Sequence, residues 1–266
     1  MLTSLQNPLV KQLRKLHRSK ERRSHQLCLL EGTHLLEAAC AVGYPLQVVC
    51  HTPDWQHRHP QLWQQAIAQA QRVEVVSPEV LKSMATTVQP DGVIAVSGRS
   101  RGQQLQPCHP VSLGLALETI QDPGNLGTII RTAAAAGVDG LWLSADSVDL
   151  DHPKVLRASA GQWFQLKMAV SADLKANVKQ AQAAGVQVVA TCPDADRVHW
   201  HADLRRPTLL LLGNEGAGLS PELIALANLQ VKIPLQVGVE SLNVAIATAI
   251  LLYEAQRQRD VNALPH

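Results

Sequence analysis

The chain has 266 residues, of which 46% are hydrophobic and 3% aromatic, so it can form two domains or one large one with a mainly aliphatic core. No apolar run reaches the roughly 18–20 residues that cross a bilayer, and residues 1–26 lack a signal-peptide stretch, so we expect a soluble cytoplasmic protein without membrane contact. The five cysteines form no C-x-x-C pair and no histidine pair has zinc spacing, which predicts reduced thiols and no metal.

The formal net charge is +2, but positive charge is concentrated in residues 1–26, which hold seven Lys/Arg and one acidic residue, Glu21. Asn7 as N-cap and Pro8 at the first helical position predict a helix over 7–17. At about 100° per residue, five basic side chains share one face: Lys11, Arg14, Lys15, Arg18 and Arg22. This face is either an ordinary solvated surface or a contact for RNA phosphates.

Further along the chain, strands and helices alternate in a first unit. Strands are predicted at 27–31, 46–50, 72–76 and 92–97, and helices at 33–41, 60–71 and 78–84. These elements predict a small α/β domain over residues 1–100. Residues 101–111 belong to a polar stretch with glycine and prolines and are expected to be a linker.

The second unit, residues 112–266, has the same alternation with more apolar strands. Strands are predicted at 113–120, 140–144, 186–192, 208–212 and 229–235, and helices at 125–136, 173–184, 221–227 and 242–258. The pattern predicts an α/β fold with a parallel sheet covered on both faces. Ligands of such sheets bind at the carboxyl ends of the strands.

Three segments of the second unit carry glycine or polar residues between an apolar run and a helix-forming stretch. They are 122–131 (DPGNLGTIIR), 213–219 (GNEGAGL) and 240–244 (ESLNV). The chain has no G-x-x-x-x-G-K-[ST], no G-x-G-x-x-G after the first strand of either unit and no G-x-S-x-G, which argues against P-loop NTPases, ordinary dinucleotide folds and serine hydrolases.

Each segment offers side chains that admit a structural and a functional interpretation. Asn125 can cap a helix, and Arg131 offers a forked donor for a phosphate or oxyanion, or pairs with a surface acid. Glu215 is either a functional carboxylate held at a strand end or a solvent-exposed residue of a plain glycine-rich turn. Ser241 is a candidate N-cap. Asn243 needs a partner, because it is an amide at the start of an apolar helix.

The ordered set N-x-G-x-x-x-R, G-N-E-G-x-G-L and S-L-N-V resembles the three motifs of the SpoU (TrmH-like) family of RNA ribose 2′-O-methyltransferases in the SPOUT superfamily. The resemblance covers about residues 113–259. Residues 29–37 (LLEGTHLLE) more loosely resemble the L30e-like substrate-binding domain found in this family.

The resemblance implies a Rossmann-like sheet with a carboxyl-terminal trefoil knot, a homodimer with the site near its interface, and S-adenosylmethionine as cofactor. It implies that the polar positions of the motifs form the catalytic site: Asn125, Arg131, Glu215, Ser241 and Asn243. It places cofactor contacts at Thr191, Leu212, Gly213, Asn214, Gly216, Ile233, Leu235 and Leu242.

We interpret Arg131 as a cation that orients the target ribose and stabilises its developing alkoxide, because a neutral arginine is very costly. His152 departs from the family pattern, where we expect a small residue or proline. The segment that follows it offers Lys154 and Arg157 for RNA binding.

Ribosomal RNA, with the large subunit favoured, is the expected substrate, because family members that act on tRNA often lack the N-terminal domain. Three alternatives stay open: a tRNA methyltransferase, an RNA- and cofactor-binding ribosome-assembly factor without turnover, and an enzyme of antibiotic resistance with the same chemistry. The intact set of Asn125, Arg131, Glu215 and Asn243 argues against a factor without turnover.

Overall fold

The computed structural model describes residues 1–99 and 111–260 and divides into two compact units. Unit 1 comprises Met1–Ser100 and Asp149–Phe164, and unit 2 comprises Arg101–Val148 and Gln165–His266. The predicted linker lies, except for its last residue, outside the described residues. The sequence pattern predicts two domains that are each continuous in the sequence, which places Asp149–Phe164 in the second domain. The contacts instead group this segment with unit 1.

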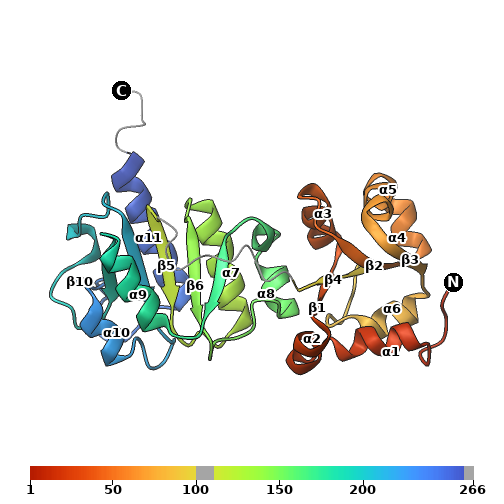
Figure 1. Cartoon of the computed structure of the whole chain (residues 1–266), viewed down its shortest axis with the longest axis horizontal. Helices are drawn as coiled ribbons and strands as arrows, with labels where there is room; N and C mark the ends of the chain where they lie inside the picture. The colour runs from red at the N-terminus through yellow and green to blue at the C-terminus, as the bar shows by residue number, and fades with distance from the viewer. Residues whose placement is uncertain (100–110, 261–266) are drawn as a thin grey trace. The chain divides into compact units, whose positions relative to one another are not determined.

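Unit 1 is a mixed four-stranded sheet with helices around it (Figure 1). Its strand order is β1 (Leu27–Glu31), β4 (Val93–Gly98), β2 (Leu46–His51) and β3 (Ala70–Val75), and only β2 and β3 run parallel. Its helices are α1 (Pro8–Lys15), α2 (Ser19–His25), α3 (Thr33–Ala41), α4 (Pro53–Arg58), α5 (Pro60–Gln69), α6 (Pro78–Met84), α8 (Pro153–Ala158) and the short η1 (Gln162–Phe164). The predicted strands and helices of this unit are confirmed, but α2, α4, α8 and η1 are additional.

The N-terminal helix forms as its capping residues predict. The Asn7 side chain accepts a hydrogen bond from the Leu9 N–H at 2.9 Å, and Pro8 occupies the first turn. Leu9, Leu13 and Leu16 are buried in the core cluster of unit 1. Helix α1 therefore docks by its leucine face.

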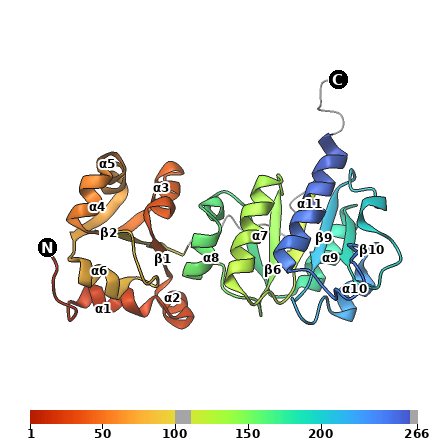
Figure 2. The ribbon, with the colours of Figure 1, turned by 180° about the vertical axis from the view of Figure 1, so that it is seen from behind.

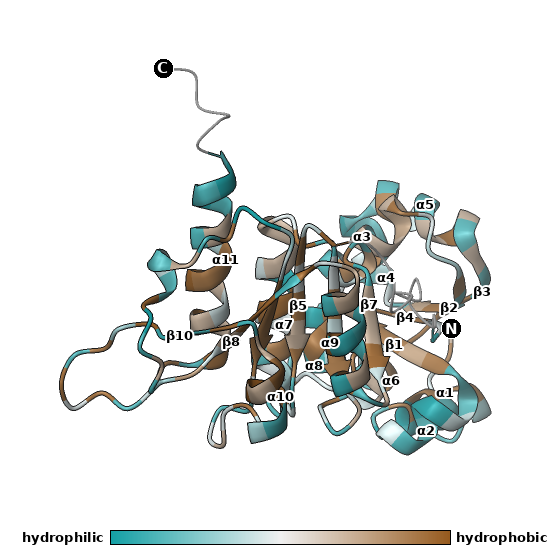
Figure 3. Cartoon of the chain, turned by 60° about the vertical axis from the view of Figure 1, so that its left-hand side comes forward, coloured by the Kyte–Doolittle hydropathy of each residue, from teal (hydrophilic) through white to brown (hydrophobic). Residues whose placement is uncertain are grey.

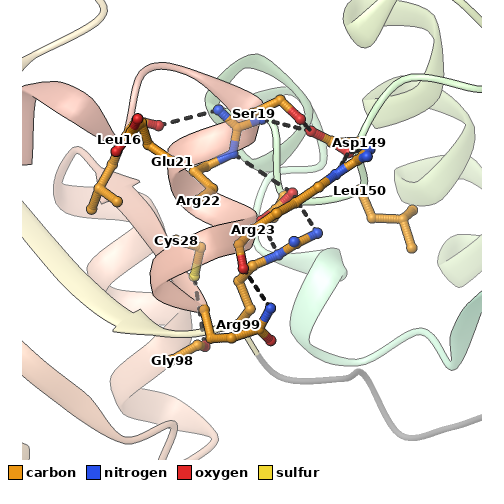
Figure 4. Close-up of polar contacts among 12 residues, drawn as sticks. Leu16, Ser19, Glu21, Arg22, Arg23, Cys28, Gly98, Arg99, Asp149 and Leu150 are labelled. Carbon is orange, nitrogen blue, oxygen red and sulfur yellow. Dashed lines mark hydrogen bonds and ion pairs between the residues drawn. The ribbon is translucent and has the colours of Figure 1, made fainter.

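Arg22 corrects the predicted basic face, because its side chain is 1% exposed. The first helix ends at Lys15 and α2 begins at Ser19, so a single helical projection does not reach Arg22. Its guanidinium donates to the carbonyl oxygens of Leu16 and His17, both at 3.1 Å, and to Asp149 Oδ2 at 3.0 Å (Figure 4). Arg22 thus supports the interior of unit 1 and is not available to RNA.

The segment Asp149–Phe164 is built into unit 1 by polar and aromatic contacts. Asp149 also accepts hydrogen bonds from Ser19 and Arg23, and Asp151 lies 2.5 Å from Arg99 Nε. Trp163 Nε1 donates to the Leu150 carbonyl at 2.9 Å and its ring meets Tyr44 edge-on. The sequence pattern missed this segment because α8 and η1 are too short to show a helical period.

Unit 2 is a six-stranded sheet, and its predicted parallel arrangement is confirmed. The strand order is β10 (Leu229–Val231), β8 (Gln187–Thr191), β9 (Thr208–Leu212), β5 (Leu113–Leu117), β6 (Gly140–Ser144) and β7 (Met168–Ser171). All five neighbouring pairs are parallel. Strand β7 is absent from the prediction, and β10 ends at Val231, four residues earlier than expected.

Helices cover both faces of this sheet. Helices α9 (Leu174–Ala183) and α10 (Pro221–Leu226) pack together on one face, in front in Figure 1. Helices α7 (Pro123–Ala135) and α11 (Val244–Asp260) pack together on the other face, in front in Figure 2. The short η2 (His199–His201) lies between β8 and β9 in the chain. Because the sheet is covered on both sides, central strands such as β5 are fully buried and hydrophobic (Figure 3). In unit 1, by contrast, helix α2 is mostly hydrophilic (Figure 3).

Candidate functional site

The first motif begins helix α7 at the carboxyl end of β5. The N-cap is Asp122, whose Oδ1 accepts the Asn125 N–H at 2.9 Å, and Pro123 occupies the first turn. Asn125 therefore does not cap the helix, contrary to one sequence interpretation. Its side-chain amide is left for other contacts because Asp122 performs the capping.

A continuous chain of side-chain hydrogen bonds joins the three motifs. Asn125 Nδ2 donates to Glu215 Oε1 at 2.9 Å, and Asn243 Nδ2 donates to Asn125 Oδ1 at 2.9 Å. Glu215 and Asn243, which are 90 and 118 positions away from Asn125 in the sequence, thus both bind its side-chain amide. The partner that the Asn243 amide requires is Asn125.

Asn243 also explains where the long helix begins. Its Oδ1 accepts the N–H of Ala245 at 2.9 Å and that of Ile246 at 3.3 Å, so Asn243 is the capping residue of α11. Ser241, our candidate N-cap, lies outside the helix and is exposed. The alternative of Ser241 as N-cap is wrong, and its catalytic role stays a prediction.

Arg131 lies further along α7 and is exposed. It follows Asn125 by six residues, which is roughly 240° around a helix, so the two side chains leave α7 in different directions. Among residues 1–99 and 111–260, Arg131 has no hydrogen-bond or ion-pair partner, so the alternative of a surface ion pair finds no support there. Its guanidinium is available to an external anion.

The second motif is a tight loop that only glycine permits. A Cβ on Gly213 would lie 2.1 Å from the backbone of Gly218, because the loop closes on itself through two Asn214–Gly218 backbone hydrogen bonds. Asn214 Oδ1 accepts the N–H groups of Gly216 and Ala217 at 2.8 and 2.9 Å. This loop is therefore preorganised by Gly213 and Asn214.

Asn214 has partners for each of its polar groups inside the protein. Its Nδ2 donates to the Thr119 carbonyl at 2.9 Å, which links the second motif to the loop before the first. The Asn214 side chain supports the loop, its predicted contact with a cofactor stays a prediction, and its neighbour Glu215 reaches Asn125.

Two of the other predicted cofactor residues, Thr191 and Leu212, lie at the ends of adjacent strands. Thr191 ends β8 beside Val231 of β10, and Leu212 ends β9, which is paired with β8. Ile233 and Leu242 are partly exposed, and Leu235 is 37% exposed. Apolar side chains that stay accessible beside backbone groups suit an adenosyl ligand, which needs flat apolar contact and a few hydrogen bonds.

The predicted RNA-binding residues of unit 1 have different surroundings. Lys11, Arg14, Lys15 and Arg18 are exposed, as is Lys154 on α8. Arg157 instead donates to Glu31 Oε2 at 3.0 Å and to Thr86 Oγ1 at 2.7 Å, so its role is at least partly structural. His152 is the N-cap of α8, its Nδ1 accepting the Lys154 N–H at 3.1 Å, which gives this departure from the family pattern a structural reason.

Within the described parts of the chain, no group of three or more His, Cys, Asp or Glu side chains could hold a metal. No helix of the same residues is long and apolar enough to span a membrane. Cys28, Cys40, Cys50 and Cys192 are free thiols. Burial raises the pKa of the Cys28 and Cys50 thiols to about 12, so neither is a nucleophile at neutral pH.

Comparison with known proteins agrees with the resemblance. Residues 112–253 match the SpoU rRNA Methylase family, and residues 7–95 match the MRM3-like substrate binding domain. The chain is 48% identical, over 99% of its length and 96% of the relative, to an uncharacterized tRNA/rRNA methyltransferase of Synechocystis sp.. It is 32% identical, over 95% of its length and 97% of the relative, to the 23S rRNA (guanosine(2553)-2′-O)-methyltransferase RlmP of Bacillus subtilis.

The fold agrees with a solved structure over both domains. A crystal structure of an AdoMet-bound rRNA methyltransferase from Sinorhizobium meliloti has a TM-score of 0.87 and 34% identity, and the match covers 96% of this chain and 97% of that one. AdoMet is S-adenosylmethionine.

Proposed function

The chain belongs to the SpoU rRNA methylase family, and from this premise we propose that it methylates a ribose 2′-hydroxyl of large-subunit ribosomal RNA with S-adenosylmethionine as methyl donor. The observation that carries the proposal is the Glu215–Asn125–Asn243 chain of hydrogen bonds, which unites the three family motifs in one polar site. A substrate-binding domain in the same chain as the methyltransferase domain supports ribosomal RNA over tRNA.

The strand ends of β8, β9 and β10 are where the chain would hold the cofactor. Gly213 lets the loop close, and Ile233, Leu235 and Leu242 offer apolar surface. The trefoil knot expected for this fold would be formed by these carboxyl-terminal segments. When bound, S-adenosylmethionine supplies a methyl group activated by a positively charged sulfur.

Asn125 and Glu215 are the groups that would fix the ribose. The Asn125 amide has a set orientation, because its nitrogen donates to Glu215 and its oxygen accepts from Asn243. One N–H and one lone pair of that amide remain for the substrate. Glu215 Oε2 has no partner within the described chain and can accept a hydrogen bond from a ribose hydroxyl.

Arg131 acts as a cation rather than a base. Removing its proton would be very costly, since the pKa of a guanidinium exceeds about 12. Its fork instead binds a substrate phosphate and stabilises the negative charge that develops on the ribose oxygen as the hydroxyl proton passes to water. Ser241 precedes the helix that presents Asn243 and contributes its hydroxyl to the same site.

A second copy of the chain completes the enzyme. Ile246 and Tyr253 are each 51% exposed on α11 and are seven residues apart, so they lie on one helix face. Val239, in the loop before the helix, is 50% exposed. This apolar surface supports a homodimer, and the dimer works in the cytoplasm, where ribosomal RNA is modified.

The dimer is tested by sedimentation velocity on the whole chain and on the Ile246→Asp/Tyr253→Asp variant. The wild type should sediment as a dimer and the variant as a monomer. A variant with Val88→Asp, which replaces an 81%-exposed apolar residue of unit 1, is the control and should stay dimeric. A monomeric wild type would refute the dimer.

The activity is tested by mapping ribose methylation in total RNA from cells with and without the protein. Loss of one large-subunit site, restored by the wild type and not by Arg131→Ala, supports the proposal. Restoration by Arg131→Lys at the wild-type rate would refute the role of the guanidinium fork. Loss of a tRNA site would establish the tRNA alternative, and an unchanged map with retained RNA binding would favour an assembly factor.

A further inference from the structure

Thr119, between the carboxyl end of β5 and the first motif, has an unusual backbone conformation. Its φ is 55°, in the left-handed region that β-branched residues rarely adopt. All three of its polar groups are bonded: its N–H donates to Ser144 Oγ at 2.7 Å, its Oγ1 to Asp146 Oδ2 at 2.6 Å, and its carbonyl accepts from Asn214 Nδ2 at 2.9 Å. Strained positions held from several sides are concentrated at functional sites.

The loop after β6 holds this conformation from one side. Asp146 accepts hydrogen bonds from Ser144 Oγ at 2.5 Å and from Thr119 Oγ1. Because the Ser144 proton points to Asp146, the lone pair of Ser144 faces the Thr119 N–H. The same loop binds both backbone groups of Ile120: Ser147 Oγ accepts the Ile120 N–H at 3.0 Å, and the Val148 N–H donates to the Ile120 carbonyl at 2.8 Å.

The loop after β9 holds Thr119 from the other side. Asn214 binds the Thr119 carbonyl, and the next residue, Glu215, accepts the Asn125 amide. Asn125 in turn follows Asp122, which lies only two residues after Ile120. The bonds form a closed circuit, so the conformation of Thr119 determines the positions of both Glu215 and Asn125.

We propose that Thr119, held by Ser144 and Asp146, is a positioning residue that sets the Asn125–Glu215 pair for the methyl-accepting ribose. The inference rests on the proposed function and adds residues outside the three motifs. The Asp146 carboxyl stays ionised for this task, since hydrogen bonds from Ser144 and Thr119 lower its pKa.

The test compares Thr119→Gly, Thr119→Ser and Asp146→Ala in the full-length chain. Glycine tolerates the positive φ and removes the whole side chain, hydroxyl and methyl together, so the backbone conformation should survive. We expect kcat for RNA methylation to fall at least about tenfold in Thr119→Gly and Asp146→Ala, with KM for the cofactor within about threefold of wild type. Thr119→Ser retains the hydroxyl and should keep kcat within about twofold.

Asp139→Ala is the matched control, because Asp139 precedes β6 just as Asp146 follows it. Asp139 Oδ2 accepts the N–H groups of Ser112 and Leu113 at 2.6 and 2.9 Å, at the amino ends of β5 and β6 and thus at the opposite end of these strands from Asp146. If Asp146 has a positioning role, Asp139→Ala should leave kcat unchanged, although it should lose about as much thermal stability as Asp146→Ala. Equal losses of kcat in Asp139→Ala and Asp146→Ala would overturn the proposal.

Side-chain amide NMR spectra separate this inference from the proposed function. The Asn125 and Asn214 amide signals should shift in Thr119→Gly and not in Asp139→Ala, whatever reaction the protein catalyses. Unchanged amide signals in Thr119→Gly would refute the circuit even if the enzyme is active. A wild type without methyltransferase activity would refute the function, while these signals would still decide the circuit.

Discussion

Replacing Arg22 by alanine should strongly destabilise unit 1, whereas replacing Arg18 should not. The two residues are four positions apart in one basic stretch, but Arg22 is 1% exposed and Arg18 is exposed. Arg22→Ala leaves the Asp149 and Asp151 carboxylates, which are 8% and 5% exposed, without a buried cation. Breaking a buried ion pair from one side costs about 3–5 kcal/mol.

Asp149 and Asp151 keep other partners, so the lower half of that range, about 3 kcal/mol, is the expected loss. Arg23 still reaches Asp149, and Arg99 Nε still lies 2.5 Å from Asp151. Since domains unfold with about 5–15 kcal/mol, such a loss is a large share of the stability of unit 1. Arg18→Ala should change the free energy of unfolding by less than about 0.5 kcal/mol.

Urea unfolding of each full-length variant measures the stability, and the salt dependence of RNA binding measures the phosphate contact. Arg18→Ala should reduce the slope of log K against log salt by about 0.7–0.9, the value for one phosphate contact. Arg22→Ala, measured where the protein is folded, should leave this slope unchanged. A loss of stability below about 1 kcal/mol in Arg22→Ala, or a smaller salt slope in that variant, would refute the structural role.

Gly213→Ala should abolish cofactor binding in calorimetry, because the added Cβ meets backbone at 2.1 Å, whereas Gly98→Ala in unit 1, whose Cβ meets nothing closer than the Gln47 side chain at 3.9 Å, should bind normally. Burial lowers the pKa of His51, so the unfolded chain takes up the proton first and stability should fall as pH drops below about 6.5; His51→Gln should flatten this dependence in urea unfolding between pH 5.5 and 7.5. Burial would raise the pKa of Glu31, but hydrogen bonds from Thr86 and Thr87 outweigh it and lower this pKa, so its contribution is present above about pH 4.3 and lost below it, and acid unfolding of Glu31→Gln should begin from a lower stability.

Most of the fold could be predicted because its elements have strong local signals. The apolar run 208–212 and the helix 78–84 are predicted to the residue, since flanking proline and serine mark their ends. The elements α8 and β7 could not be predicted, because six and four residues are too short to show a period. The membership of Asp149–Phe164 in unit 1 depends on contacts that no local pattern contains.

The site was predictable where chemistry required a partner and unpredictable where two groups competed for one task. An amide at the start of an apolar helix predicted that Asn243 binds something, and Asn125 is that partner. Which residue caps each helix could not be decided, because Asp122 and Asn125, like Ser241 and Asn243, all have capping side chains. Arg22 shows the same limit for charge, since its burial follows from a helix break at residues 16–18.

The three motifs differ in what would break them. Asn125 and Asn243 each combine helix-start geometry with a side-chain bond, so replacing either residue removes a bond between two motifs while most of the backbone stays. Gly213 acts through its lack of a side chain, which lets the Gly218 backbone approach closely. Arg131 makes no hydrogen bond or ion pair with the described residues, so its replacement should alter turnover and leave stability unchanged. Comparing turnover with stability in these variants therefore separates the group that faces substrate from the groups that shape the site.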